Sequence, residues 1–497
     1  MVQSKSTQNW LVPVFITFIG GFMSVLDSSI INVAIPGMMQ SFNVSANEMD
    51  LVVTIYMLVL GVVIPFNGWL GNRYGYKQLY ITALVLFTLG STLCAISWSV
   101  PALIISRIIQ ALGGGVLMPV MMTMIKKLVP KGSFGTAMGL VGIAMLLAPA
   151  LGPTLGGYLV EYVGWRWIFT INLPIGALGV LIAIFSLPEF PKETAEKLDV
   201  GGAVTSVLML FSLLLALSEG ASWGWKSEPI VLLFYLFAVS LVLFIIIELT
   251  VKKPLLNLRI FKNITFTMAN ALSAISTVGL FSALFYIPLF LQNIRGLGAL
   301  ETGILMLPGA LVTGLMMPVS GKLYDKIGPK IMSILGIIFL TITTFLLHNI
   351  TVDTSNGTII FWLVLRGITM PFTTVPAQAA ALDVVAVEDA SDAASITNIV
   401  TKISSSFAIA VLTVVLTGRT AFYAATASWG ISSSSMGASQ IMAAGQSKGF
   451  GLSAISGLIQ QNAFVRSIDD IFLITTIIAL IGFIPALFIN SEKKASS

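Results

Sequence analysis

Residues 102–119 read ALIISRIIQALGGGVLMP and place a permanent cation, Arg107, within about 20 residues that otherwise read as a membrane helix. An arginine at bilayer depth costs at least about 2.5–3.5 kcal/mol, so we expect Arg107 to face a protein interior or a water-filled cavity and to have a partner. The candidate partner is Asp27, the only carboxylate deep inside any predicted span. This pair is therefore the first candidate for a functional site.

The composition indicates a polytopic membrane protein. Of the 497 residues, 56% are hydrophobic and only 9% are charged, whereas soluble domains carry roughly 25% charged residues. The net charge of +5 does not indicate nucleic-acid binding, because the Lys and Arg residues are spread over many loops. With one Cys (Cys94) and one His (His348), the chain can form no intramolecular disulfide, and we expect no metal site.

Hydropathy predicts fourteen membrane helices. Their boundaries, good to about three residues, are 12–35, 51–71, 78–98, 101–125, 135–160, 167–187, 199–218, 229–250, 264–291, 302–321, 330–349, 358–382, 392–418 and 469–490. We interpret the first run as a retained span, not a cleaved signal, because further spans follow directly. An even number of spans puts both termini on one side. Seventeen of the 26 Lys and Arg residues lie in the loops of that side and six on the other. The positive-inside rule thus predicts cytoplasmic termini in the cell membrane.

The chain contains an internal duplication. Residues 68–77 read GWLGNRYGYK, and residues 321–330, offset by 253 positions, read GKLYDKIGPK. Arg107 and Arg366 are 259 positions apart, and each precedes a Met-Pro pair. The duplication predicts an all-α membrane fold of two six-helix bundles, with two inserted helices between them. The predicted units are residues 1–190, 191–255 and 256–497, the last with an external loop at about 419–468. Two repeated bundles suit alternating access around a midplane site.

Residues 26–36 read LDSSIINVAIP, which resembles the helix 1 signature of a known transporter family. The family is the major facilitator superfamily, specifically its fourteen-helix drug:proton antiporters, the multidrug and lincomycin-type exporters. The resemblance covers essentially the whole chain and implies the major facilitator fold, with Asp27 as the protonatable group. Physical chemistry agrees with that role: burial disfavours a charged carboxylate and a guanidinium favours it, so moving the partner changes proton affinity. A static structural ion pair is the alternative.

Arg107 and Gln110 are three residues apart and share one face of a helix. The pair resembles the Arg-x-x-Gln-Gly motif of the same family, which implies a role in proton coupling. The alternative is a cation that is merely solvated by backbone carbonyls.

Residues 142–157 read GIAMLLAPALGPTLGG, which resembles the antiporter motif Gly-Pro-x-x-Gly-Gly. Small side chains every four residues, at 144, 148, 152 and 156, let another helix approach closely, and two prolines each remove a backbone donor. The resemblance favours exporters over symporters and implies a conformational role for Gly152, Pro153, Gly156 and Gly157. A generic packing seam is the alternative. Residues 165–176 (WRWIFTINLPIG) resemble a further signature of the group.

The two duplicated loops resemble the family's Gly-x-Leu-x-Asp-Arg-x-Gly loops, which are thought to latch the outward-facing state. The residues implied in gating are Gly68, Asn72, Arg73 and Gly75 in the first copy and Asp325, Lys326 and Gly328 in the second. The first copy departs from the pattern, with Asn72 where Asp is usual and Tyr76 where Arg is common. A carboxylate near a helix N-terminus gains about 0.3–1 kcal/mol. We therefore expect the first latch to be weak and Asp325 to contribute more, unless both loops are simply tight basic turns.

An adaptable apolar cavity is expected between the halves, because the chain holds 21 Met and places aromatic side chains near that interface. The candidates for lining it are Asn32, Gln110, Met118, Phe281, Phe285 and Tyr286. Packing in the core is the alternative for the aromatic and Met residues. Lys402, in the stretch NIVTKISSS at 398–406, resembles an Asn-x-x-Arg/Lys element, but we interpret it as a snorkelling structural lysine.

These features predict a proton-driven exporter of amphiphilic drugs or toxic compounds, active as a monomer in the lipid bilayer and without a cofactor. No Gly-x-x-x-x-Gly-Lys-Ser/Thr loop occurs in the chain, so an ion gradient is the expected energy source. A carrier for one physiological metabolite, peptide or lipid-like compound is the alternative. An enzyme is disfavoured because the sequence shows no Ser/His/Asp set. The sequence does not identify the substrate, although a single deep acid weakly disfavours dications.

Overall fold

The computed structural model describes residues 10–190, 197–430 and 451–490, and within them every regular element is helical. Fourteen helical spans are long and apolar enough to cross a membrane, as predicted. The elements are α1 (Leu11–Phe42), α2 (Ala46–Val63), η1 (Ile64–Phe66), α3 (Asn67–Tyr74), α4 (Tyr76–Ala95), α5 (Val100–Leu128), η2 (Lys131–Ser133), α6 (Phe134–Tyr162), α7 (Trp167–Thr170), α8 (Asn172–Ser186), α9 (Val200–Trp223), α10 (Glu228–Thr250), η3 (Leu258–Lys262), α11 (Ile264–Asn293), α12 (Ala299–Ile327), α13 (Pro329–Leu347), α14 (Asn356–Thr369), α15 (Pro371–Asp383), α16 (Ala390–Gly430), α18 (Gly451–Ile481) and α19 (Phe483–Phe488).

Several helices run further than hydropathy predicted. The first helix continues to Phe42, and α16 and α18 reach well into the predicted external loop. The boundaries predicted at 418 and 469 were therefore wrong, because a hydropathy window stops at charged residues that a helix can carry beyond the apolar layer. In this case the charges are paired: the Arg419 Nε and Asp470 Oδ2 atoms are 2.5 Å apart, which joins α16 to α18. Residues 431–450 of that predicted loop lie outside the described residues.

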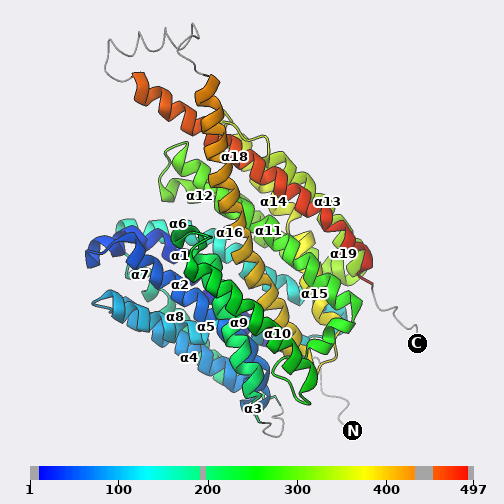
Figure 1. The fold of residues 1–497 in the computed structure, drawn as a ribbon. Helices are drawn as coiled ribbons and strands as arrows, with labels where there is room; N and C mark the ends of the chain where they lie inside the picture. The colour runs from blue at the N-terminus through cyan, green and yellow to red at the C-terminus, as the bar shows by residue number, and fades with distance from the viewer. Residues whose placement is uncertain (1–9, 191–196, 431–450, 491–497) are drawn as a thin grey trace, which may run out of the picture.

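The helices form two groups that follow the order of the chain. In Figure 1, α1 to α8 lie on one side of the molecule and α11 to α19 on the other, while α9 and α10 lie along the boundary. The α9 helix packs against α10, against α2 of the first half and against α16 of the second. Only 17% of the apolar stretch of α10 is buried, the smallest share among the fourteen described spans, so α10 is the most peripheral of them. The domain limits at residues 190 and 255 remain a prediction.

The two halves meet most closely where α6 crosses α12, and glycines make this possible. A Cβ atom built on Gly321 of α12 would lie 2.1 Å from the carbonyl oxygen of Gly135 on α6. A Cβ on Gly139 would lie 2.7 Å from the carbonyl oxygen of Met317. Small residues let membrane helices approach to backbone contact, so any larger side chain at these positions would force α6 and α12 apart.

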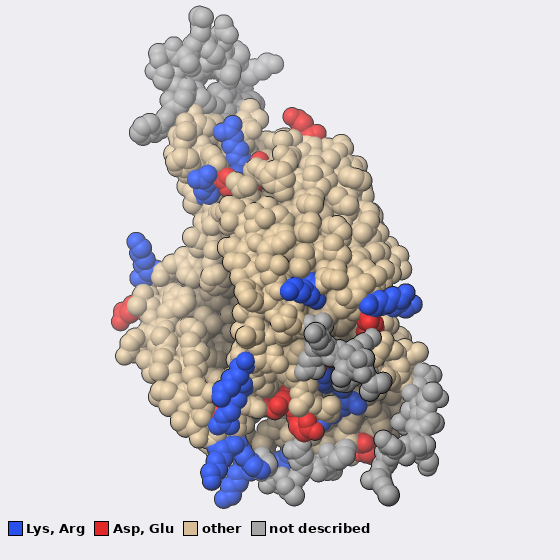
Figure 2. All heavy atoms as spheres, turned by 90° about the vertical axis from the view of Figure 1, so that its right-hand side faces the viewer, with Lys and Arg blue, Asp and Glu red and all other residues tan. Residues whose placement is uncertain are grey.

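The surface has the charge distribution of a membrane protein. Figure 2 shows one group of charged side chains near the top and others from mid-height downward, with a broad tan area between them. One end carries the duplicated loops, with Arg73 and Lys326 both exposed. We call it the basic end.

Candidate functional site

Asp27 lies near the middle of α1 and is buried, with 1% of its surface exposed. All three of its closest polar contacts are donors from other helices. The Arg107 Nη1 atom lies 2.5 Å from Oδ2, while Oδ1 accepts hydrogen bonds from Gln110 Nε2 at 2.9 Å and Asn172 Nδ2 at 3.1 Å. The carboxylate is thus held by a charge-assisted hydrogen bond and two neutral ones.

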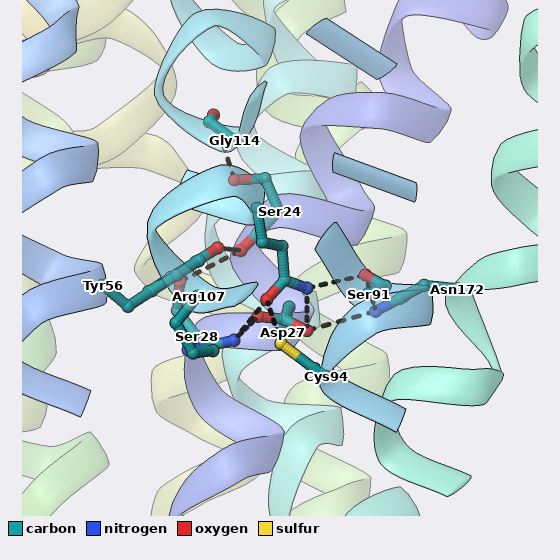
Figure 3. Close-up of polar contacts among 10 residues, drawn as sticks. Ser24, Asp27, Ser28, Tyr56, Ser91, Cys94, Arg107, Gly114 and Asn172 are labelled. Atoms are coloured by element: carbon teal, nitrogen blue, oxygen red, sulfur yellow. Dashed lines mark hydrogen bonds and ion pairs between the residues drawn. The ribbon is translucent and has the colours of Figure 1, made fainter. Parts of the chain in front are cut away.

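Arg107 and Gln110 project from one face of α5, as their spacing predicted, and both side chains are buried. Arg107 Nη1 also donates to Gln110 Oε1 at 2.7 Å, which closes a triangle with Asp27. Gln110 holds both partners at once because its amide carries a donor and an acceptor. The structure therefore brings together Asp27, Arg107 and Gln110, the three polar residues on which the sequence prediction rested. Figure 3 shows Asp27 and Arg107 side by side.

A second layer of neutral groups orients the triangle. Ser91 on α4 accepts hydrogen bonds from Gln110 Nε2 at 2.7 Å and from Asn172 Nδ2 at 3.3 Å. The Cys94 thiol, one turn along α4, lies 3.8 Å from Gln110 Oε1. The site therefore joins four helices of the first half, α1, α4, α5 and α8.

The guanidinium of Arg107 is only partly satisfied by hydrogen bonds. Its Nε and Nη2 atoms are buried and have no hydrogen-bond partner among the described residues. The ring of Tyr56 on α2 compensates in part, because the guanidinium carbon lies 3.6 Å from the ring centroid, within cation–π range. Arg107 therefore has unused donors that could serve a different partner.

The site is linked to α6 by a proline. Pro153 has no N–H, so the carbonyl of Pro149, one turn earlier, cannot receive its usual helical hydrogen bond. The hydroxyl of Ser29, two residues after Asp27, donates to that carbonyl at 2.8 Å. A Cβ on Gly152 would lie 2.3 Å from the Ser29 Oγ, and a Cβ on Gly156 would lie 2.8 Å from Ile30 Cγ1. Gly152 and Gly156, two of the small residues spaced four apart, thus face α1.

Gly157 faces the opposite way. A Cβ on Gly157 would lie 3.4 Å from the Cα atom of Leu300 on α12. The motif therefore spans two interfaces of α6, one within the first half and one between the halves.

The second duplicated loop contacts the first half of the chain through Asp325. Asp325, near the end of α12, accepts hydrogen bonds from the backbone N–H groups of Gly135 at 2.7 Å and Thr136 at 3.0 Å, and from the Thr136 hydroxyl at 2.9 Å. These N–H groups belong to the first turn of α6, where a helix leaves donors unpaired. A carboxylate of one half thus caps a helix of the other. Lys326 is exposed beside it, and Gly328 takes a positive φ of 84° that ends α12.

The first loop is built differently. Asn72 Oδ1 accepts a hydrogen bond from the Tyr76 hydroxyl at 2.8 Å, within its own loop. Gly75 takes a φ of 90°, and the exposed Arg73 lies over the ring of Trp69 at 5.2 Å. The helix that faces the first loop is α16 of the second half, as α6 faces the second loop. The first turn of α16 carries its own acid, Asp392.

Asp392 lies close to that first loop. A Cβ on Gly68 would be 2.8 Å from Asp392 Oδ1. Gly68, Asn72 and Asp392 line one cavity of about 240 Å³ at the basic end. At the second loop the acid belongs to the loop itself, as Asp325, whereas at the first loop it belongs to the helix that faces the loop, as Asp392.

The predicted cavity-lining residues do not form one group in this conformation. Asn32 and Phe285 are exposed, whereas Met118 and Tyr286 are buried. Tyr286 packs in the core of the second half, and its hydroxyl lies 3.2 Å from Thr413 Oγ1. Phe281 is partly buried on the same helix. A role for these residues in substrate binding remains a prediction.

Sequence reasoning missed several polar residues. Asn172, Ser91 and Tyr56 were not selected, although a polar side chain inside an apolar span was a usable signal for the first two. Two further buried acids lie toward the ends of their helices and were not selected from the sequence. Glu219, one residue past the predicted end of its span, is 9% exposed and accepts a hydrogen bond from Thr54 at 3.1 Å. Glu248 is fully buried near the end of α10.

Comparison with known proteins agrees with this architecture. The sequence profile of the Major Facilitator Superfamily matches residues 17–409. The lincomycin resistance protein LmrB of Bacillus subtilis is 30% identical over 99% of this chain and 98% of its own. The putative multidrug resistance protein MdtD of Pectobacterium atrosepticum is 35% identical over 68% of this chain and 72% of its own.

Solved structures show the same fold. The human organic anion transporter MFSD10 superposes with a TM-score of 0.61 at 14% identity, covering 95% of this chain and 99% of that one. At this identity the likeness concerns the fold alone. Together with the profile match and the two bacterial relatives, it shows that the chain is a multi-pass membrane transporter, not an enzyme, and that it belongs to the Major Facilitator Superfamily.

Proposed function

We propose that the chain is a proton-coupled exporter of amphiphilic drugs or toxic compounds, working by alternating access with its basic end and both termini in the cytoplasm. The observation that carries the proposal is the buried Asp27–Arg107 pair, held at 2.5 Å by groups on four helices. A buried ion pair contributes little net stability, because desolvation offsets the attraction. Its retention in a transporter is better explained by a working role than by a structural one.

A proton on Asp27 would change the energy of the site in a definite direction. Neutralising the carboxylate leaves Arg107 as a buried cation without a counter-charge, which is costly in a low-dielectric interior. The cost falls if α1 and α5 shift so that the free donors of Arg107 reach water or another acceptor. Protonation therefore favours a different arrangement of these helices, and deprotonation restores the present one.

A path for this shift to reach the other half is built into the packing. Ser29 follows Asp27 by two residues and bonds to the proline-freed carbonyl of α6. The α6 helix in turn contacts α12 of the second half at backbone distance. A displacement of α1 is thus felt where the halves meet.

The present conformation is tied at the basic end. Besides the Asp325 contact, Lys126 on α5 donates to the backbone carbonyl of Asp383 on α15 at 2.9 Å. These two contacts hold the halves together on the side that we assign to the cytoplasm. They fit a state that is closed to the cytoplasm, in which a proton would enter from outside.

The test is transport in inverted membrane vesicles under an imposed pH gradient. Asp27→Asn removes the charge while keeping the shape, and we expect it to abolish gradient-driven accumulation. Asp353→Asn, an exposed loop acid, is the matched control and should transport normally. Normal accumulation by Asp27→Asn would exclude the coupling role.

A panel of chemically distinct amphiphiles tests the breadth of the substrate range. The panel includes lincomycin, because of the name of the relative LmrB, and is run with and without an uncoupler. Uncoupler-sensitive transport of several compounds supports a drug exporter. Transport confined to one compound would replace it with a dedicated carrier.

A further inference from the structure

Three polar side chains of the second half each point at a methionine sulfur of the first half. The donor-to-sulfur pairs are Gln378 Nε2 to Met145 Sδ at 2.9 Å, Asn398 Nδ2 to Met122 Sδ at 3.0 Å and Lys402 Nζ to Met57 Sδ at 2.8 Å. The donors lie on α15 and α16, and the acceptors on α6, α5 and α2. Asn398 and Lys402 are one helical turn apart and so share a face.

A thioether sulfur is a weak hydrogen-bond acceptor, so Gln378 Nε2 and Lys402 Nζ are poorly satisfied, whereas Asn398 Nδ2 also donates to the backbone carbonyl of Ala394 at 2.8 Å. The Oε1 atom of Gln378, a residue only 2% exposed, has no partner among the described residues. The same is true of the buried hydroxyls of Thr373 on α15 and of Ser395 and Thr397 on α16. Buried polar groups normally find good partners. The unpaired Gln378 oxygen beside Met145 therefore indicates that this amide is completed by another group.

Lys402 gives this surface a positive charge. The residue is partly buried, and among the described residues it forms no ion pair. A second cation of this half, the buried Arg366, donates to the Thr344 hydroxyl and to the backbone carbonyl of Gly279, which are both neutral. A buried cation without an anion is expensive. An anionic partner would therefore be favoured there over a cationic one.

We propose that Gln378, Asn398 and Lys402, opposite Met57, Met122 and Met145, form the substrate-binding surface, and that its preferred substrate is an amphiphile with one carboxylate or similar anionic group. Lys402 pairs with the anion, and the two amides donate to it or to a neighbouring polar atom. The flexible methionines contact the apolar body, for which their polarizable side chains are suited. This inference rests on the proposed export function, since it names the substrate class of that transporter.

The test is a binding titration on the purified full chain in lipid nanodiscs, without a pH gradient. The probes are a dansyl-labelled undecanoate and its neutral methyl ester, followed by dansyl fluorescence. We expect the carboxylate to bind at least tenfold more tightly than the ester. Lys402→Met should remove that preference by weakening carboxylate binding alone, Lys402→Arg should keep it, and Lys226→Met, an exposed control, should bind both probes normally.

Equal binding of the two probes to the unmodified chain would overturn the inference, as would an equal loss of both in Lys402→Met. The comparison of probes on the unmodified chain decides the matter even if the Lys402 variant does not fold. Failure here is distinct from failure of the proposed function. Proton-driven transport of uncharged drugs without carboxylate preference refutes only the substrate class, whereas carboxylate binding without gradient-driven transport refutes only the coupling.

Discussion

The Asp325 carboxylate on α12 accepts a hydrogen bond from the backbone N–H of Gly135 on α6 at 2.7 Å. An acid from one half of the transporter thereby fills the N-terminal position of a helix in the other half, where the helix dipole favours negative charge. The contact joins the halves without a salt bridge. Its strength depends on the charge of one side chain and on the alignment of one helix, so any rotation that moves α6 away from α12 must break it.

Asp325→Asn should shift the transporter toward opening at the basic end. The substitution keeps an acceptor but removes the charge, a loss of about 0.3–1 kcal/mol at a helix terminus. A spin-label pair at Ser133 and Lys322, measured by pulsed electron resonance, should show a larger long-distance population. Asp353→Asn is the control, and an unchanged distance distribution in Asp325→Asn would contradict a latch role.

At the contact between the first loop and α16, we expect the negative charge of Asp392 on α16 to stabilise the protein, and an acid at position 72 of the loop not to do so. Asp392→Asn should lower the midpoint of thermal unfolding, because it removes a charge from the first turn of α16 and weakens an acceptor for the Asn257 backbone N–H at 3.1 Å. We expect a loss of about 1 kcal/mol. Asn72→Asp restores the acid usual at that loop position but adds a like charge to the same cavity, so it should not stabilise. If Asn72→Asp stabilised the protein, Asp392 would not be a substitute for the carboxylate that is missing at position 72.

Gly152→Ala should impair both folding stability and transport. The added methyl would lie 2.3 Å from Ser29 Oγ and 2.7 Å from Ser29 Cβ, so α1 and α6 must separate. Overpacking of this kind typically costs about 1–3 kcal/mol. Gly418→Ala is the matched control on exposed helix, because a Cβ there meets nothing within 4 Å. Thermal unfolding and vesicle transport measure both effects, and equal behaviour of the two variants would exclude a close-packed seam.

Tyr56 should support Arg107 through its ring and not its hydroxyl. Tyr56→Phe keeps an aromatic face 3.6 Å from the guanidinium, while Tyr56→Leu removes it. The cation–π contribution is about 0.5–2 kcal/mol. Thermal unfolding of the two variants separates the possibilities. We expect the Phe variant to resemble the unmodified chain and the Leu variant to unfold earlier, and the opposite order would assign the effect to the hydroxyl.

Sequence reasoning predicted the strongest interactions of the Asp27 site, those of its charged residues, and missed the weaker ones of its neutral polar residues. Arg107 and Asp27 could be paired in advance, because a charge in a membrane span is so costly that it constrains its surroundings. Gln110 followed from its helical spacing to Arg107 and from the resemblance to the Arg-x-x-Gln-Gly motif. Asn172 and Ser91 carried a signal, a polar side chain inside an apolar span, but neutral polar residues occur throughout the spans, and only tertiary packing shows that these two and Tyr56 lie at the site.

Helix ends were the least predictable part of the fold. Hydropathy measures the apolar layer and not the helix, so it stopped at residue 418 although α16 continues to Gly430. The same limit hid Glu219, which lies one residue past its predicted span. The charge of Asp392 also looked unremarkable in sequence. Its meaning depends on the neighbouring first loop, which lies more than 300 positions earlier in the chain.

The extended α16 also has a practical consequence. Its 41 residues would measure about 60 Å at 1.5 Å per residue, about twice the apolar thickness of a bilayer. Together with α18 it projects past the other helices at the end opposite the duplicated loops (Figure 1). We expect this pair of helix ends to lie outside the lipid, where an antibody fragment that binds them would report the orientation of each molecule in a reconstituted vesicle.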